Sequence, residues 1–139
     1  YKVCKMFKLS KKVEYGLIAV KHMATPGESC TSSAKEIADK YKIPYDLLSK
    51  ILQKLKKHEI LGSVQGTHGG YKLLMDPKEL TLAQIFNAIE GESYILDCGK
   101  HEDSEACSIY ETCILSSPLK KIQRQINSYF NSTTLAEIV

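Results

Sequence analysis

Three cysteines lie close together in the C-terminal third of the chain. Cys98 and Cys107 are separated by eight residues, and Cys107 and Cys113 by five. The intervening sequence is too polar for a core strand, so the thiols are expected to face a ligand, one another or water. Thiolates converging from a loop can hold iron and sulfide. A thiol–disulfide switch, a zinc site and spectator thiols stay open, although the Cys-x-x-Cys pairs common in structural zinc sites are lacking.

The composition predicts one compact domain with a modest core, to which a pairing helix is appended. The chain has 139 residues, of which 43% are hydrophobic and 25% charged. No apolar run reaches the roughly 20 residues of a membrane span, so no membrane partner is expected. Nothing resembles a signal peptide, and residues 1–6 are expected to be an extension or tag remnant. Five cysteines without export signals predict a reducing, cytoplasmic location.

Charge is distributed unevenly along the chain. Lysines outnumber acids in residues 1–91, which carry +6, whereas residues 92–117 carry −5 and residues 118–139 carry +2. A basic first part is compatible with a polyanionic partner, and the acidic cysteine segment is not a nucleic-acid surface.

The first half of the chain predicts a helix-turn-helix. A first helix through Leu9–Met23 is stopped by Pro26 and Gly27. A second, short helix opens with the capping box Ser33–Glu36, in which the serine and glutamate side chains satisfy backbone donors. After the turn forced by Ile43-Pro44, a third helix has an apolar face and a basic outer face. Two short helices joined by a tight turn place the second helix in the DNA major groove.

A glycine-rich hairpin follows the third helix. The segments 60–65 and 70–75 are predicted strands, and Gly66–Gly70 is the turn between them. Such a hairpin next to a helix-turn-helix is a wing, and its small polar tip can approach phosphates closely. A further capped helix is predicted from Thr81 to Gly91, and a helix from Pro118 carries apolar residues at a spacing suited to pairing with another helix. The expected fold is therefore mainly α with a small β wing, a winged helix-turn-helix plus a C-terminal dimerisation helix.

Candidate DNA contacts lie on the third helix and on the wing. Early residues of such a helix reach base edges, and lysines neutralise phosphates. The predicted contacts are Ser49, Lys50 and Lys54 on the helix, and Gln65, Thr67 and His68 on the wing.

The order of these parts resembles the IscR/NsrR family of bacterial winged-helix regulators. The resemblance covers nearly the whole chain from Met6 and is most specific in the wing phrase Ser63–Tyr71 and in the cysteine triplet. It implies that a homodimer binds promoter DNA and that Cys98, Cys107 and Cys113 hold a 2Fe-2S or 4Fe-4S cluster.

The resemblance leaves the fourth ligand of the cluster open. In one branch of the family a histidine lies three residues after the last cysteine, where this chain has Ser116. In the branch that senses nitric oxide and redox state, an acidic residue of the first helix reaches across the dimer, and Glu14 occupies the matching position. His101 competes with Glu14, because an imidazole binds iron readily.

The sequence therefore predicts a DNA-binding transcription regulator that senses redox state, nitric oxide or iron–sulfur status. Its expected parts are a DNA-binding domain at residues 7–91, a cluster-binding loop at residues 92–117 and a dimerisation helix with a tail at residues 118–139. The alternative is a cluster-free regulator, whose thiols sense oxidants directly or which a partner protein controls. We expect no enzymatic activity, since the sequence has no nucleophile–base pair and no phosphate-binding loop.

Overall fold

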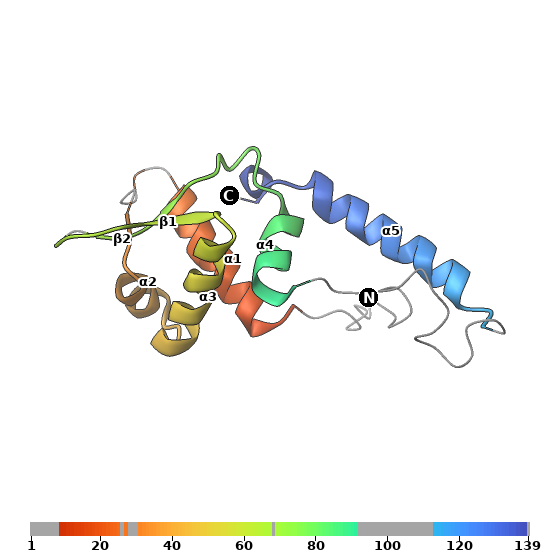
Figure 1. Ribbon diagram of the computed structural model, residues 1–139, viewed down its shortest axis with the longest axis horizontal. Coiled ribbons are helices and arrows are strands. Elements are labelled where there is room, and N and C mark those ends of the chain that lie inside the picture. Colours follow the sequence, from red (N-terminus) through yellow and green to blue (C-terminus); the bar gives the residue numbers. More distant parts are fainter. Residues whose placement is uncertain (1–8, 26, 28–30, 68, 92–112, 139) are drawn as a thin grey trace, which may run out of the picture.

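A computed structural model of the chain describes residues 9–25, 27, 31–67, 69–91 and 113–138 (Figure 1). The elements are helices α1 (Lys11–Ala24), α2 (Ala34–Tyr41) and α3 (Tyr45–Lys57), strands β1 (Leu61–Val64) and β2 (Gly70–Leu73), helices α4 (Leu82–Glu90) and α5 (Ser116–Ser132), and a closing 3-10 turn (Leu135–Glu137). This architecture confirms the predicted winged helix-turn-helix followed by a long C-terminal helix. No helix in these ranges is long and apolar enough to cross a membrane.

Both predicted capping boxes are confirmed. The Ser33 hydroxyl accepts a hydrogen bond from the Glu36 amide at 3.1 Å, and the Glu36 carboxylate accepts one from the Ser33 amide at 3.1 Å. At the start of α4, the Thr81 hydroxyl accepts from the Gln84 amide at 3.3 Å, and the Gln84 side chain accepts from the Thr81 amide at 2.9 Å. Local sequence therefore fixes where α2 and α4 begin, because each box satisfies backbone donors that have no partner within the helix.

Several boundaries differ from the prediction by one or two residues. The strands are shorter than expected, with Leu61 opposite Leu73 and Val64 opposite Gly70. Helix α5 begins at Ser116, two residues before Pro118. A proline is tolerated in the first turn of a helix, because the backbone N–H that it lacks would have no intrahelical partner there.

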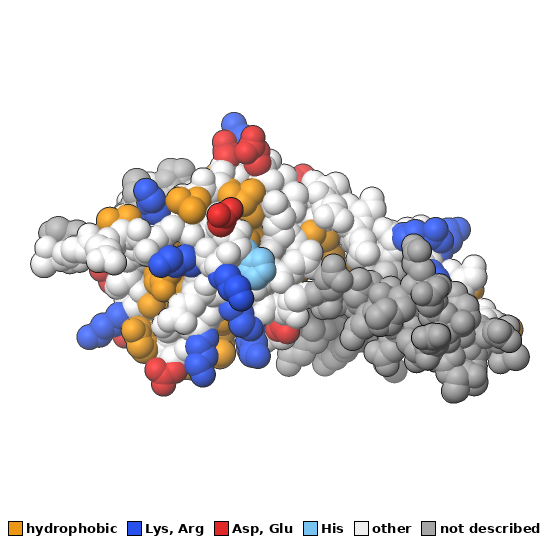
Figure 2. Space-filling view, in the orientation of Figure 1, with side chains coloured by type: hydrophobic (Ala, Val, Ile, Leu, Met, Phe, Trp, Pro, Cys, Tyr) orange, Lys and Arg blue, Asp and Glu red, His pale blue; other side chains and the backbone are white. Residues whose placement is uncertain are grey.

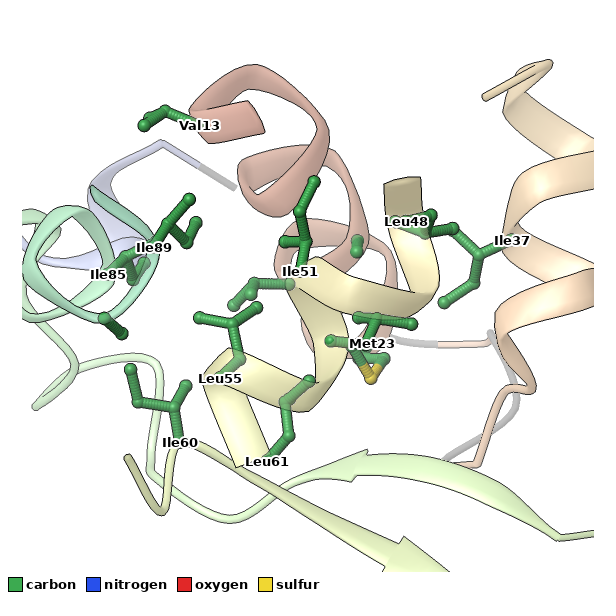
Figure 3. Packing of buried hydrophobic residues seen from close by; sticks show 14 of the residues in the cluster. Val13, Met23, Ile37, Leu48, Ile51, Leu55, Ile60, Leu61, Ile85 and Ile89 are labelled. Carbon is green, nitrogen blue, oxygen red and sulfur yellow. The ribbon is translucent and has the colours of Figure 1, made fainter. Parts of the chain in front are cut away.

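The core lies where α1, α3 and α4 meet (Figure 3). The apolar face predicted for the third helix is confirmed, because Leu48, Ile51, Leu52 and Leu55 are all at most 2% exposed. Ile85 and Ile89 of α4 pack into the same cluster. This packing fixes the orientation of α3 and leaves its other face to solvent.

Helix α5 is attached to the rest of the molecule mainly through its C-terminal end. The Phe130 ring lies 4.9 Å from the Phe86 ring of α4, centroid to centroid. Beyond α5 the chain turns back, so that Leu135 is fully buried and its amide donates to the Leu80 carbonyl at 2.8 Å. In Figure 1, the other end of α5 extends away from the bundle formed by α1, α3 and α4.

Candidate nucleic-acid interface and metal centre

The solvent face of α3 carries the predicted helix contacts. Lys50 is exposed on the side opposite the buried leucines, and Ser49 is half-buried at the flank of the leucine stripe. The turn before α3 is tight, because Lys42 adopts a left-handed conformation with φ of 56° and Pro44 precedes the first helical residue. Figure 2 shows lysine side chains over the part of the surface formed by α2 and α3. A positive surface of this kind attracts a polyanion.

Tyr45 belongs to the same face and was not selected from the sequence. It is the first residue of α3 and is 53% exposed. Tyr45 and Ser49 are four residues apart, so they lie on one side of the helix. Its spacing of three and seven residues from Leu48 and Leu52 matches that of the leucine stripe, so the sequence pattern gave no signal that Tyr45 is exposed.

The wing is attached to the bundle by a bridge that the sequence did not predict. Ser32 pairs with Tyr71 of β2 through two backbone hydrogen bonds of 3.0 and 2.8 Å. A side chain at Gly70 would collide with the Ser32 backbone, so the close approach requires glycine there. The base of the wing is therefore held on the segment that leads into α2.

A buried histidine reinforces this attachment. His22 of α1 is 6% exposed, and its ring nitrogens lie 3.0 Å from the Tyr41 hydroxyl and 3.2 Å from the Ser32 hydroxyl. The ring thus links α1, the end of α2 and the residue that pairs with the wing. Hydroxyl groups can donate or accept, so both contacts suit either tautomer of the ring.

The tip of the wing projects from this base. Gln65 and Thr67 are exposed, and the Gly69 amide donates to the Gly66 carbonyl at 3.0 Å, which closes the turn. His68, the third predicted wing contact, lies outside the described residues. The arrangement brings Gln65 and Thr67 to the end of an arm beside α3, as a minor-groove or phosphate contact requires.

Lys54 makes a contact within the protein. Its ammonium group donates a hydrogen bond to the Ile89 carbonyl at 3.2 Å, in the last turn of α4. Its predicted contact with DNA stays a prediction, in competition with this internal role.

Of the cysteine triplet, only Cys113 lies within the described residues. It is half-buried and lies three residues before Ser116, the first residue of α5. Cys98, Cys107 and His101 lie outside the described residues. Within the described ranges no three His, Cys, Asp or Glu side chains gather closely enough to hold a metal ion. The ligand set is therefore argued from chemistry: three thiolates and a carboxylate are donors that iron accepts.

Glu14 lies in the first turn of α1. Its carboxylate forms an ion pair with the Lys11 ammonium at 2.7 Å, and this hydrogen bond and the negative charge of Glu14 raise the pKa of Lys11. The same end of α1 is bonded to the end of α4, since the Ser10 hydroxyl donates to the Glu90 carboxylate. Glu14 thus lies in the part of the molecule where α4 ends and residues 92–112 begin.

The winged-helix architecture is also found in known proteins. The model of the Rrf2 family, described as iron-dependent transcriptional regulators, matches residues 9–139. The chain belongs to the Rrf2 family. It is a transcription regulator of the kind that binds DNA, and the members of this family are not enzymes.

Individual members of the Rrf2 family match along most of the chain. The regulator IscR of Sodalis glossinidius is 26% identical, with 95% of this chain and 78% of that protein covered. The regulator NsrR of Shouchella clausii is 24% identical, with 94% and 87% covered. The solved structure of CymR, the global cysteine regulator of B. subtilis, superposes with a TM-score of 0.73 at 24% identity and covers 96% of both chains. The predicted family is thereby confirmed.

Proposed function

We propose that this Rrf2 protein is a homodimeric transcription regulator whose DNA affinity depends on an iron–sulfur cluster. The cluster would be held by Cys98, Cys107 and Cys113, with Glu14 as the fourth ligand. When bound, it supplies a centre that changes charge or composition on oxidation or on reaction with nitric oxide. The names of the IscR and NsrR relatives and the chemistry of the donor set support this proposal.

The observation that carries the proposal is the position of the cysteine segment between α4 and α5. The segment begins directly after Gly91, the residue that ends α4, and Cys113 lies three residues before the start of α5. Helices α4 and α5 pack on each other through Phe86 and Phe130. A change in how the segment is held therefore acts on the pair of helices that joins the DNA-binding bundle to α5.

The DNA contacts follow from the surface of α3 and the wing. Tyr45, Ser49 and Lys50 would enter the major groove, because early residues of such a helix reach base edges. Gln65, Thr67 and His68 would contact the neighbouring backbone or minor groove. A two-fold dimer would read two half-sites at a fixed separation, so a small rotation of one subunit against the other changes affinity.

Helix α5 would form the dimer interface. Ile122 is 41% exposed and Tyr129 is 65% exposed, while Leu119 and Ile126 are half-buried on the same helix. A single chain leaves this apolar stripe in contact with water. A second copy would cover it with an identical stripe, as helix pairing across a two-fold axis allows.

The decisive experiment is anaerobic purification with iron and sulfide counts. We expect the wild type to be brown, the variant with all three cysteines replaced by serine to be colourless, and Glu14→Ala to hold a labile cluster. Glu79→Ala, which removes an exposed carboxylate far along the chain, is the matched control and should keep the cluster. A colourless, iron-free wild type would exclude the cluster.

A second candidate function is direct thiol sensing without a cluster. Ser116 stands where one branch of the family has a histidine ligand, which favours this alternative. Mass spectrometry after mild oxidant would then find a disulfide between loop cysteines, with no requirement for iron. Operator affinity, measured on a duplex selected from a random library by the wild-type protein, should change with that disulfide.

A further inference from the structure

The last turn of α4 is held by two other helices at the point where the cysteine segment begins. From α1, the Ser10 hydroxyl donates to the Glu90 carboxylate. From α3, the Lys54 ammonium donates to the Ile89 carbonyl at 3.2 Å. Gly91 then ends the helix, with its amide bonded to the Asn87 carbonyl at 3.0 Å. The end of α4 is thus bonded to α3, the helix that carries the predicted base contacts.

The Lys54 contact stabilises the C-terminal end of α4 electrostatically. The last carbonyls of a helix have no intrahelical donor and carry partial negative charge. Helix α4 has no basic residue in its last turn and ends on Glu90, which adds a negative charge at the unfavourable end. Lys54 supplies from α3 both the missing donor and the missing positive charge.

Tight packing beneath this hydrogen bond keeps α3 and α4 in one register. Ile51 of α3 and Ile89 of α4 are each 2% exposed and belong to the same cluster (Figure 3). Gly16 of α1 lies against both, and a Cβ added there would collide with the Ile89 side chain and lie 3.3 Å from Ile51. Close-packed interiors shift as units and do not deform smoothly, so a displacement of the end of α4 must be shared by α3.

We propose that Lys54 is a positioning residue, which fixes α3 on the end of α4, and that it does not contact a DNA phosphate. Where the cysteine segment responds to a signal, this bond passes the displacement of α4 to α3. That second step rests on the proposed function, whereas the positioning role does not.

The positioning role can be measured without DNA. Hydrogen exchange of the Gly91 amide reports opening of the last turn of α4. We expect Lys54→Met to raise the exchange rate about two- to tenfold, the range that corresponds to losing one hydrogen bond. Lys54→Arg, which keeps a donor, should restore the wild-type rate. The matched control is Lys57→Met, which removes an exposed lysine of the same helix and should leave the rate unchanged. An unchanged rate in Lys54→Met would overturn the proposal.

The salt dependence of operator binding separates positioning from phosphate contact. Removal of one phosphate contact lowers the slope of log K against log salt concentration by about 0.9. For Lys54→Met we expect weaker binding with the wild-type slope, and for Lys54→Arg wild-type binding. A slope lowered by about 0.9 in Lys54→Met would overturn the proposal, whatever the exchange rate.

The coupling step has its own readout. The ratio of operator affinities between cluster-loaded and cluster-free protein should be smaller in Lys54→Met than in the wild type, and a ratio equal to that of the wild type would overturn the coupling. If the wild type shows no difference between the two forms, the proposed function fails, while the exchange rate and the salt slope still decide whether Lys54 positions α3.

Discussion

The bundle of residues 9–91 and the helix α5 use their apolar side chains in opposite ways. In the bundle, residues from α1, α3 and α4 enclose one another, and Leu48, Leu52 and Ile85 are fully buried. In α5, no residue whose side chain is described is buried, and Tyr129 is 65% exposed. The bundle therefore completes its core within one chain. The apolar stripe of α5 needs a further surface, for which we propose a second copy.

The helices also differ in how they begin. Helices α2 and α4 start at complete capping boxes. Helix α5 begins at Ser116 and, like α3, has no side-chain capping bond, because Leu115 and Pro44 occupy the two N-cap positions. The start of α5 is thus not fixed by a side-chain cap, and it lies three residues after Cys113. A helix whose first turn is weakly specified can respond to what the neighbouring thiol binds.

The largest effect is expected where α5 is anchored to the bundle. Leu135→Ala should lower the free energy of unfolding by about 2–5 kcal/mol, because it removes a fully buried leucine and leaves a cavity. Urea denaturation followed by circular dichroism measures this loss. Ile138→Ala, at a position 36% exposed in the same tail, is the control and should cost less than about 1 kcal/mol. Equal costs for the two variants would mean that the tail is not an anchor.

Ile122→Glu tests the unpaired stripe of α5. A charge in the proposed interface should convert the protein from a species of about twice 15.6 kDa to single chains of 15.6 kDa. Operator affinity should fall roughly 100-fold, because linked half-site contacts are lost. Light scattering gives the mass, and Gln125→Glu, an exposed position on the same helix, is the control. Retention of the dimer in Ile122→Glu would show that α5 pairs through another face.

Gly70→Ala breaks a contact inside the bundle and leaves α5 intact. The added Cβ would collide with the Ser32 backbone and displace β2 from its bridge. We expect operator affinity to fall about tenfold and the dimer to be retained. A displaced wing would lose its contacts with DNA, and a tenfold loss corresponds to about 1.4 kcal/mol of binding free energy. Leu74→Ala, which follows β2 at an exposed position, should leave the affinity unchanged. Wild-type affinity in Gly70→Ala would exclude a role for the wing in binding.

Thr81→Ala gives the smallest effect. It removes the hydroxyl that accepts from the Gln84 amide, and should lower the free energy of unfolding by about 1 kcal/mol. Thr81→Ser keeps the hydroxyl and should retain most of the stability. Thermal denaturation of both variants measures the difference. If alanine and serine gave the same midpoint, the capping box would contribute nothing to α4.

Local sequence was sufficient to predict most elements of the fold. The capping boxes of α2 and α4, the turn at Pro44 and the leucine pattern of the third helix depend on residues a few positions apart, and each was confirmed. The predicted ends of the strands and the predicted start of α5 were wrong by one or two residues. Helix and strand ends depend on hydrogen bonds as well as on side-chain pattern.

The residues of the candidate site also divide into those that local sequence could predict and those that it could not. Ser49 and Lys50 could be selected because the apolar stripe of α3 defines the opposite face. The role of Lys54 could not be selected, since its partner Ile89 is 35 residues away and offers a backbone carbonyl, a group that every residue has. The bridge between Ser32 and Tyr71 could not be predicted either, because it also joins backbone groups of residues far apart in the sequence.

By itself, the sequence determined the order of helices and strands and the family resemblance, and it supplied the proposed donor set of three thiols and a carboxylate, because these depend on residue types and short spacings. Only the tertiary structure decided that His22 supports the wing, that Lys54 joins α3 to α4, and that α5 leaves an apolar stripe uncovered. These are contacts between segments distant in sequence. They form only when the whole chain packs, so no local sequence pattern predicts them.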